Sequence, residues 1–332
     1  KEIVDPFLKR PDEDGSWWAI EAEKAQEVSA DDSTLITTAH AKKPRSSYID
    51  YIDTDDGNFR IWYPSGETIM AKGWNLEDKT KRENIDISPE KAYEIAVRTK
   101  NELDDNSIRK KLVDLMKKEP LGDGTKGGDN KLDIYLFPLS TVAETIPENY
   151  YSPPTACYMY INPAVVLHPI GDRRYPTYLA HEIFHAIQLA YSMDIDRDLW
   201  WMEATAQWAE DYVFPGYNSE HRRLDKFIPY PEIELYKGNN AHKGYKYGAY
   251  VFPFYLTQPG IYSDDIIRKT WEGCGNNGSC LKSINKNIDG GFKKHWREFT
   301  LWNYNKKPVK KYKDDSGFFP KISSADGKNI RE

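Results

Sequence analysis

The segment TYLAHEIFHAIQLAYSM, residues 177–193, carries two histidines four positions apart in an otherwise apolar run. Residues four apart lie on the same face of an α-helix, so His181 and His185 are expected to direct imidazole nitrogens at one metal ion. Zinc suits this arrangement because it accepts imidazole and carboxylate ligands in tetrahedral geometry. Glu182 lies about 100° further round such a helix, where its carboxylate reaches a water on the metal and serves as general base.

A catalytic zinc also needs a third protein ligand and one open position. The extended motif HExxHxxGxxH is not present, since Gln188 and Tyr191 stand where its glycine and third histidine would be. The segment WWMEATAQWAED offers Glu203, which is flanked by alanines that let two helices approach closely. A carboxylate in so apolar a run is costly to bury unless it is paired or binds a cation. We therefore expect Glu203 as third ligand, with Glu210 on the same face as its rival.

The two segments HEIFHAIQ and WMEATAQWAED together resemble the gluzincin metallopeptidases, the class that includes thermolysin. The pattern WxEATAxW is similar to secreted bacterial peptidases of the hyicolysin-like kind, and the resemblance is strong over residues 176–214. It implies an α+β, zincin-like catalytic domain of two lobes, with a strand-containing N-terminal half, a mostly helical C-terminal half and the zinc site between them. It also implies His181, His185 and Glu203 as zinc ligands and Glu182 as the base.

The resemblance leaves two roles open. Many gluzincins carry an acidic residue four positions after the ligand glutamate, where it orients a zinc-bound histidine; this chain has Gln207 there, whose amide can still accept an imidazole N–H, and Glu210 is the alternative. An oxyanion needs a hydrogen-bond donor besides the metal, and gluzincins often take a tyrosine or histidine from the downstream part of the chain. In HKGYKYGAYVFPFYL, Tyr245 matches a Y-x-x-G spacing and Tyr247 directly precedes a glycine, so both are candidates.

The remaining sequence predicts the elements that position these residues. Residues 1–45 are expected to be a loop-rich extension, 46–215 a zincin-like subdomain, and 216–332 a mostly helical subdomain. Within the second region, the patterns predict a hairpin over 46–66, a helix over 87–118 that is bent or split at DDNS, strands over 131–140 and 156–168, and helices over 177–193 and 199–214. The strand YMYINPAVV is expected at a sheet edge, where it would pair with substrate.

The composition limits partners and location. The net charge of −6 and the lack of a basic stripe argue against a nucleic-acid partner, and no apolar run is long enough to span a membrane. Cys274 and Cys280 bracket the loop GCGNNGSC, which suits a short disulfide, although two free thiols are the alternative. We expect a secreted or cell-surface protein, by default monomeric, whose signal peptide has been removed. Acidic loops at 53–58 and 194–198 are candidate Ca²⁺ sites.

These observations favour a zinc metalloendopeptidase acting on protein or peptide substrates. The resemblance implies an endopeptidase in preference to an aminopeptidase, because no GxMEN-like segment is present to capture a free amino terminus. Two alternatives stay open. One is an aminopeptidase of the same class, and the other is an inactive binding module on the same fold.

Overall fold

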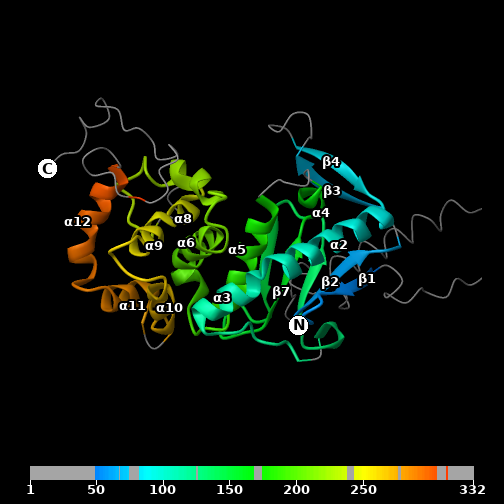
Figure 1. Ribbon diagram of the computed structural model, residues 1–332, viewed down its shortest axis with the longest axis horizontal. Helices are drawn as coiled ribbons and strands as arrows, with labels where there is room; N and C mark the ends of the chain where they lie inside the picture. Colours follow the sequence, from blue (N-terminus) through cyan, green and yellow to red (C-terminus); the bar gives the residue numbers. More distant parts are fainter. Residues whose placement is uncertain are drawn as a thin grey trace, which may run out of the picture. The chain divides into compact units, whose positions relative to one another are not determined.

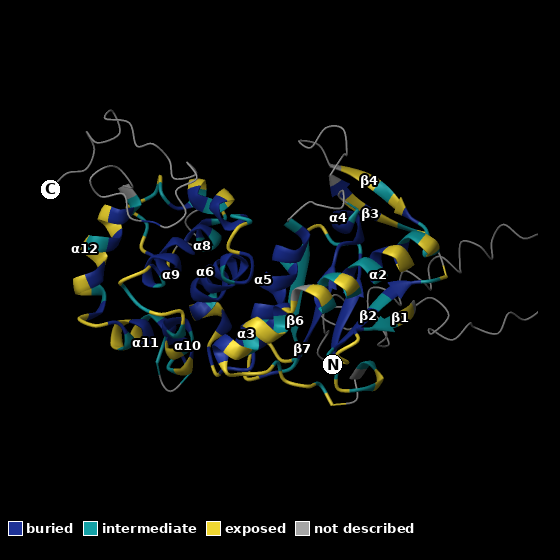
Figure 2. Cartoon of the chain, viewed as in Figure 1, coloured by how far each residue is buried: buried dark blue, intermediate teal, exposed yellow. Residues whose placement is uncertain are grey.

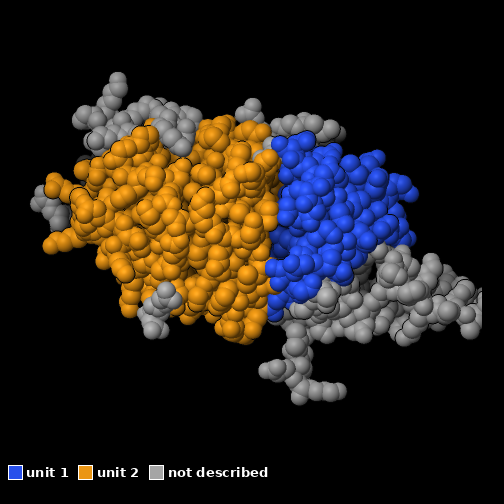
Figure 3. Space-filling view, turned by 60° about the horizontal axis from the view of Figure 1, so that its bottom comes forward, with its two compact units in different colours: residues 1–106, 122–148, 157–172 blue, residues 107–121, 149–156, 173–332 orange. Residues whose placement is uncertain are grey.

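The computed structural model describes residues 49–66, 68–74, 82–124, 126–167, 174–237, 243–275, 278–304 and 312. They form two compact units, coloured separately in Figure 3: the first falls within 1–106, 122–148 and 157–172, and the second within 107–121, 149–156 and 173–332. This division differs from the predicted boundary at 215, because the helices that follow residue 173 belong with the C-terminal part. The predicted extension, residues 1–45, lies outside the described residues.

The first unit is built on a mixed five-stranded sheet (Figure 1). Its strands, in spatial order, are β1 (Ile49–Asp53), β2 (Phe59–Pro64), β5 (Leu132–Leu136), β7 (Cys157–Ile161) and β6 (Ala143–Pro147). The β2–β5 and β5–β7 pairs are parallel, and the two outer pairs are antiparallel. The β1–β2 pair confirms the predicted hairpin.

Side-chain alternation gives the sheet two different faces. One face carries Ile61, Ile134 and Met159, which lie side by side in the register and are fully buried. Helix α2 (Pro89–Asn106) packs on β1 and β2, and its buried residues recur at helical spacing, which fits a helix with one face on a sheet. The opposite face is aromatic, with the rings of Trp62 and Tyr135 stacked at 5.9 Å.

The predicted helix over 87–118 is split at the expected place. Ser88 caps the start of α2, since its hydroxyl accepts a hydrogen bond from the Lys91 backbone N–H at 3.3 Å. Ser107 has a left-handed backbone with φ of 49°, and α3 (Ile108–Met116) begins directly after it. The 3₁₀ turn η3 (Lys126–Gly128) and strand β5 follow. The prediction of a strand over 131–140 is confirmed in its first half.

The strand predicted over 156–168 was too long. Strand β7 ends at Ile161 because Asn162 caps a short helix, α4 (Pro163–Val166), by accepting a hydrogen bond from the Ala164 N–H at 3.0 Å. The prediction of an edge position was also wrong, since β7 pairs with β5 on one side and β6 on the other. A separate hairpin, β3 (Ile69–Trp74) with β4 (Arg82–Ile87), contacts α4.

The second unit is helical and is organised around α5 (Arg174–Gln188) and α6 (Ile195–Val213). Both helices are buried on most of their surface, and Figure 2 draws them largely in dark blue. Helix α6 begins earlier than predicted because Asp194 caps it, accepting a hydrogen bond from the Arg197 N–H at 3.0 Å. The surrounding elements are α3, η4 (Glu220–Lys226), α8 (Tyr245–Gly248), α9 (Val251–Leu256), α10 (Asp265–Glu272), α11 (Cys280–Asn287) and α12 (Gly291–Tyr304).

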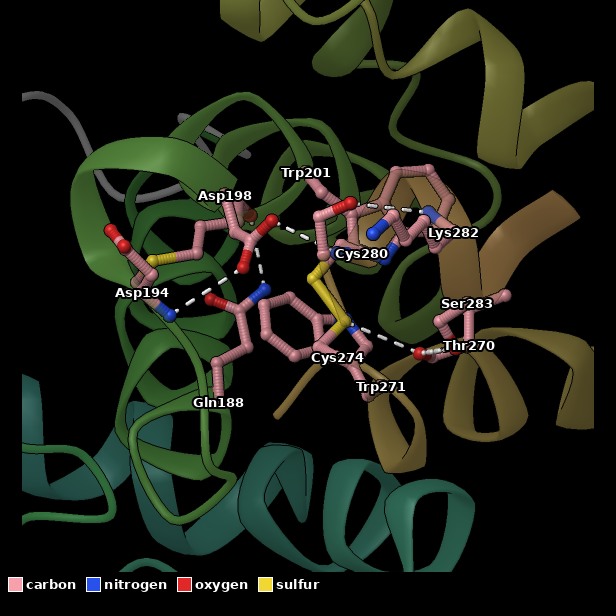
Figure 4. The surroundings of a disulfide bond; sticks show 12 residues. Gln188, Asp194, Asp198, Trp201, Thr270, Trp271, Cys274, Cys280, Lys282 and Ser283 are labelled. Atoms are coloured by element: carbon pink, nitrogen blue, oxygen red, sulfur yellow. Dashed lines mark hydrogen bonds between the residues drawn. A yellow bond between two sulfur atoms is a disulfide. The ribbon is translucent and has the colours of Figure 1, made fainter. Parts of the chain in front are cut away.

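The predicted disulfide is formed between Cys274 and Cys280, and it joins the end of α10 to the start of α11 (Figure 4). The Cys280 backbone N–H donates to the buried Asp198 carboxylate of α6 at 2.9 Å, so this turn is fixed to the central helix. The third cysteine, Cys157, is a buried free thiol in β7.

The chain therefore combines strands and helices, as the α+β prediction requires. All described strands belong to the first unit, and most described helices belong to the second. No described helix has the length and apolar character needed to cross a membrane.

Candidate metal centre

Helices α5 and α6 bring three predicted ligands together. His181 and His185 lie one turn apart on α5, and Glu203 faces them from α6. Glu203 Oε2 lies 3.3 Å from His181 Nε2 and 3.5 Å from His185 Nε2. One ligand atom from each residue lies within 4.8 Å of the others, and the three side chains are only 10–12% exposed. Within the described ranges no other group of three His, Cys, Asp or Glu residues meets this condition.

The distances from Glu203 Oε2 to the two imidazole nitrogens fit zinc. Two atoms bonded to one zinc ion at about 2.0–2.2 Å and at the tetrahedral angle lie roughly 3.3–3.6 Å apart. The two measured distances from Glu203 Oε2, 3.3 and 3.5 Å, fall in that range. The donor set of two imidazoles and one carboxylate is also that of a catalytic zinc, which keeps its fourth position open.

Each histidine is oriented through its other ring nitrogen. His185 Nδ1 lies 2.6 Å from Gln188 Oε1, and the Gln188 amide donates to Met202 O at 3.0 Å and to Thr205 Oγ1 at 2.8 Å. Gln188 therefore holds the imidazole of His185, and the amide of Gln188 is itself held by hydrogen bonds to α6. This role could have been predicted from the sequence, because Gln188 lies three positions after His185 on the same helix.

His181 is oriented by Glu210. This contact distinguishes the two roles left open for Glu210, namely third ligand and residue that orients a histidine. Glu210 Oε1 lies 3.3 Å from His181 Nδ1, on the side of the ring away from Glu203. The other oxygen of Glu210 accepts a hydrogen bond from the Ser219 hydroxyl. These contacts favour Glu210 as a residue that orients His181 over Glu210 as third ligand, in the role predicted for Gln207.

Replacing Glu210 with glutamine is expected to weaken zinc binding about 10–100-fold, as loss of a carboxylate behind a zinc-bound histidine generally does. The affinity is measured by competition with a chromophoric chelator. Gln207→Ala is the matched control on the same helix and should leave the zinc affinity unchanged. Equal effects of the two substitutions would contradict the assignment of Glu210.

The cluster is rich in negatively charged carboxylates. Burial disfavours the charged form of Glu203, but hydrogen bonds with His181 and His185 outweigh it and hold the pKa of Glu203 well below its ordinary value. Burial likewise lowers the pKa of His181, whereas Glu203, Glu210 and the charge of Glu182 together raise it to about 10. Buried carboxylates around two imidazoles attract a cation, and a bound metal would take the place of the proton at His181.

Glu182, the predicted base, lies on α5 directly after His181 and is 8% exposed. Its negative charge raises the pKa of both His181 and Tyr247, so its carboxylate belongs to the same electrostatic environment as the ligands. These relations are compatible with the predicted role of Glu182 as general base.

The two candidate tyrosines differ in their surroundings. The Tyr247 ring lies 6.1 Å from the His181 ring, and burial together with the charges of Glu203 and Glu182 raises its pKa well above the ordinary value. The Tyr245 hydroxyl instead donates to the backbone carbonyl of Ile233 at 2.8 Å, so this residue serves packing in α8. These contacts favour Tyr247 as the donor near the metal and speak against Tyr245.

The two acidic loops considered for calcium are engaged with protein groups. In the loop 53–58, Asp53 pairs with Arg60 at 2.9 Å and Asp55 pairs with Lys100 at 2.6 Å. The carboxylates of 194–198 cap α6 or accept hydrogen bonds from neighbouring groups. These contacts give the calcium prediction no support.

Comparison with protein-family models gives no match for this chain. Comparison with curated proteins gives no match either. The functional interpretation therefore rests on the residues and geometry of the metal centre.

Proposed function

We propose that this chain is a zinc-dependent metalloendopeptidase of the gluzincin kind. His181, His185 and Glu203 would hold the ion, and Glu182 would act as general base. The observation that carries the proposal is the convergence of one ligand atom from each of three largely buried side chains, with Glu203 Oε2 at 3.3 and 3.5 Å from the two imidazole nitrogens. The zincin-like arrangement in two lobes is part of the same proposal.

The chemistry divides between the metal and the chain. Bound zinc would supply a Lewis acid that polarises the scissile carbonyl and makes water nucleophilic near neutral pH. Glu182 takes the proton of the attacking water and passes it to the nitrogen of the leaving amine. Tyr247, kept protonated by its buried and acidic surroundings, donates its hydroxyl to the oxygen that gains charge.

The test is cleavage of casein and of a peptide blocked at its amino terminus. We expect internal cuts in both, loss of cleavage after treatment with 1,10-phenanthroline, and recovery when zinc is restored. Cleavage that requires a free amino terminus would favour an aminopeptidase. Zinc binding without cleavage of any peptide would favour a binding module, and cleavage that survives metal removal would exclude the proposed mechanism.

We also propose that the protein works outside the cytosol, at the cell surface or after secretion. The Cys274–Cys280 disulfide supports this location, because disulfides form and persist in oxidising compartments.

Tyr247→Phe is expected to lower kcat about 100-fold with little change in KM, since one donor to a developing oxyanion contributes on that scale. Tyr245→Phe is the matched control in the same helix. It loses the hydrogen bond to Ile233 and should lower the free energy of unfolding by about 1 kcal/mol while kcat is unchanged. Steady-state kinetics and urea unfolding separate the two. A larger fall of kcat in Tyr245→Phe would reverse the assignment.

A further inference from the structure

The two oxygens of Glu203 have different partners. Oε2 faces the Nε2 atoms of His181 and His185, whereas Oε1 lies 2.6 Å from Nζ of Lys246. The side chains of both members of this ion pair are mostly buried, Glu203 at 10% exposed and Lys246 at 24%. A charge-assisted contact of this length is stronger and better defined than an exposed surface pair.

Lys246 reaches the site from α8, which packs on α6. Its ammonium also lies 5.0 Å from the centre of the Tyr247 ring, so it touches two of the residues assigned to the reaction. Neither the HExxH pattern nor the downstream glutamate accounts for a lysine at this position.

We propose that Lys246 is a positioning residue that limits Glu203 to one metal-binding oxygen. This proposal rests on the proposed zinc site. An ionised carboxylate offers two oxygens, either or both of which can bind a metal. Because Lys246 holds Oε1, only Oε2 is available to the metal, and the fourth position that a catalytic zinc requires stays open.

The charge of Lys246 gives the proposal a second consequence. An ammonium beside a ligand carboxylate draws electron density from it and repels a metal cation. Lys246 therefore favours an open site at the expense of metal affinity. A lysine that only supports the local structure would have the opposite effect, since its removal would loosen the ligand and weaken metal binding.

The experiment compares the full-length wild type with Lys246→Met and Lys246→Arg after cobalt(II) substitution and in zinc competition. Lys246→Met should show the weaker visible bands of a higher coordination number, should bind zinc up to about tenfold more tightly, and should lose about 10–100-fold in kcat. Lys246→Arg keeps a charged donor and should retain the wild-type spectrum. Lys226→Met, a substitution of a half-exposed lysine paired with Asp225, is the control and should change nothing.

A wild-type cobalt spectrum in Lys246→Met, or weaker zinc binding by that variant, would overturn the proposal. If Lys246→Met does not fold, Lys246→Gln tests the same point, because it removes the charge and keeps a polar end on a slightly shorter side chain. The spectral change does not depend on cleavage. A changed spectrum in a protein that cuts no peptide would support the role of Lys246 and contradict the peptidase proposal, whereas a wild type that binds neither metal would contradict both.

Discussion

Replacing Glu182 with glutamine is expected to lower kcat for peptide hydrolysis by about 10²–10⁴-fold, the contribution usual for a positioned general base. The amide has nearly the same shape as the carboxylate but cannot take a proton from water. KM should change little, because Glu182 is not expected to bind substrate. The measurement is steady-state cleavage of a blocked fluorogenic peptide.

The zinc content of Glu182→Gln distinguishes loss of a general base from loss of the metal. Because Glu182 is not among the three converging ligands, the variant should keep zinc at the wild-type level. Loss of both zinc and activity would show that Glu182 supports the site and would remove its assignment as base. Full activity in the zinc-loaded variant would contradict the mechanism itself.

The second large effect is expected for His185→Ala. Zinc sites bind with about 10–16 kcal/mol for four protein ligands, or roughly 2.5–4 kcal/mol for each ligand. Loss of one ligand should therefore weaken zinc binding by about 10²–10³-fold. The affinity is measured by chelator competition, and activity should disappear at zinc concentrations that saturate the wild type.

His295→Gln is the matched control for that substitution. His295 is also buried in the second unit, but its ring nitrogens lie at hydrogen-bonding distance from the hydroxyls of Tyr255 and Tyr262. Its replacement should leave the zinc affinity unchanged. A comparable loss of zinc in both variants would indicate that histidine substitutions damage the fold and would remove His185 from the ligand set.

The ligand set could be predicted because it depends on local spacing and on the cost of burial. His181 and His185 share a helix face whatever the tertiary structure is. Glu203 stands in a run so apolar that its burial requires a counter-charge. The structure brings these three residues together as expected.

The residues that orient the ligands depend on how α5 and α6 are rotated against each other, which no local pattern determines. Glu210 follows Glu203 by seven positions and lies about 20° from it around the helix, whereas Gln207 lies about 40° away on the other side. This small angular difference decides which side chain reaches His181. Lys246 could not be predicted for the same reason, because it acts across a contact between two helices, whereas Gln188 lies three positions after His185 on the same helix and could have been predicted.

The predicted element boundaries differ from the structure where a capping residue lies inside a predicted strand or loop. Asn162 followed by Pro163 is a helix start, and it ends β7 five residues after it begins. Asp194 is likewise the cap of α6, and it lies within the acidic segment that is predicted to be a loop. Both signals were present in the sequence.

The most direct test of the zinc site is the metal content of the protein purified without added metal, measured by mass spectrometry beside His185→Ala. We expect one zinc per chain in the wild type and substoichiometric zinc in the variant. A wild type that contains no zinc and takes up none on reconstitution would contradict the proposed function. It would leave His181, His185 and Glu203 as a buried hydrogen-bonded cluster between two helices.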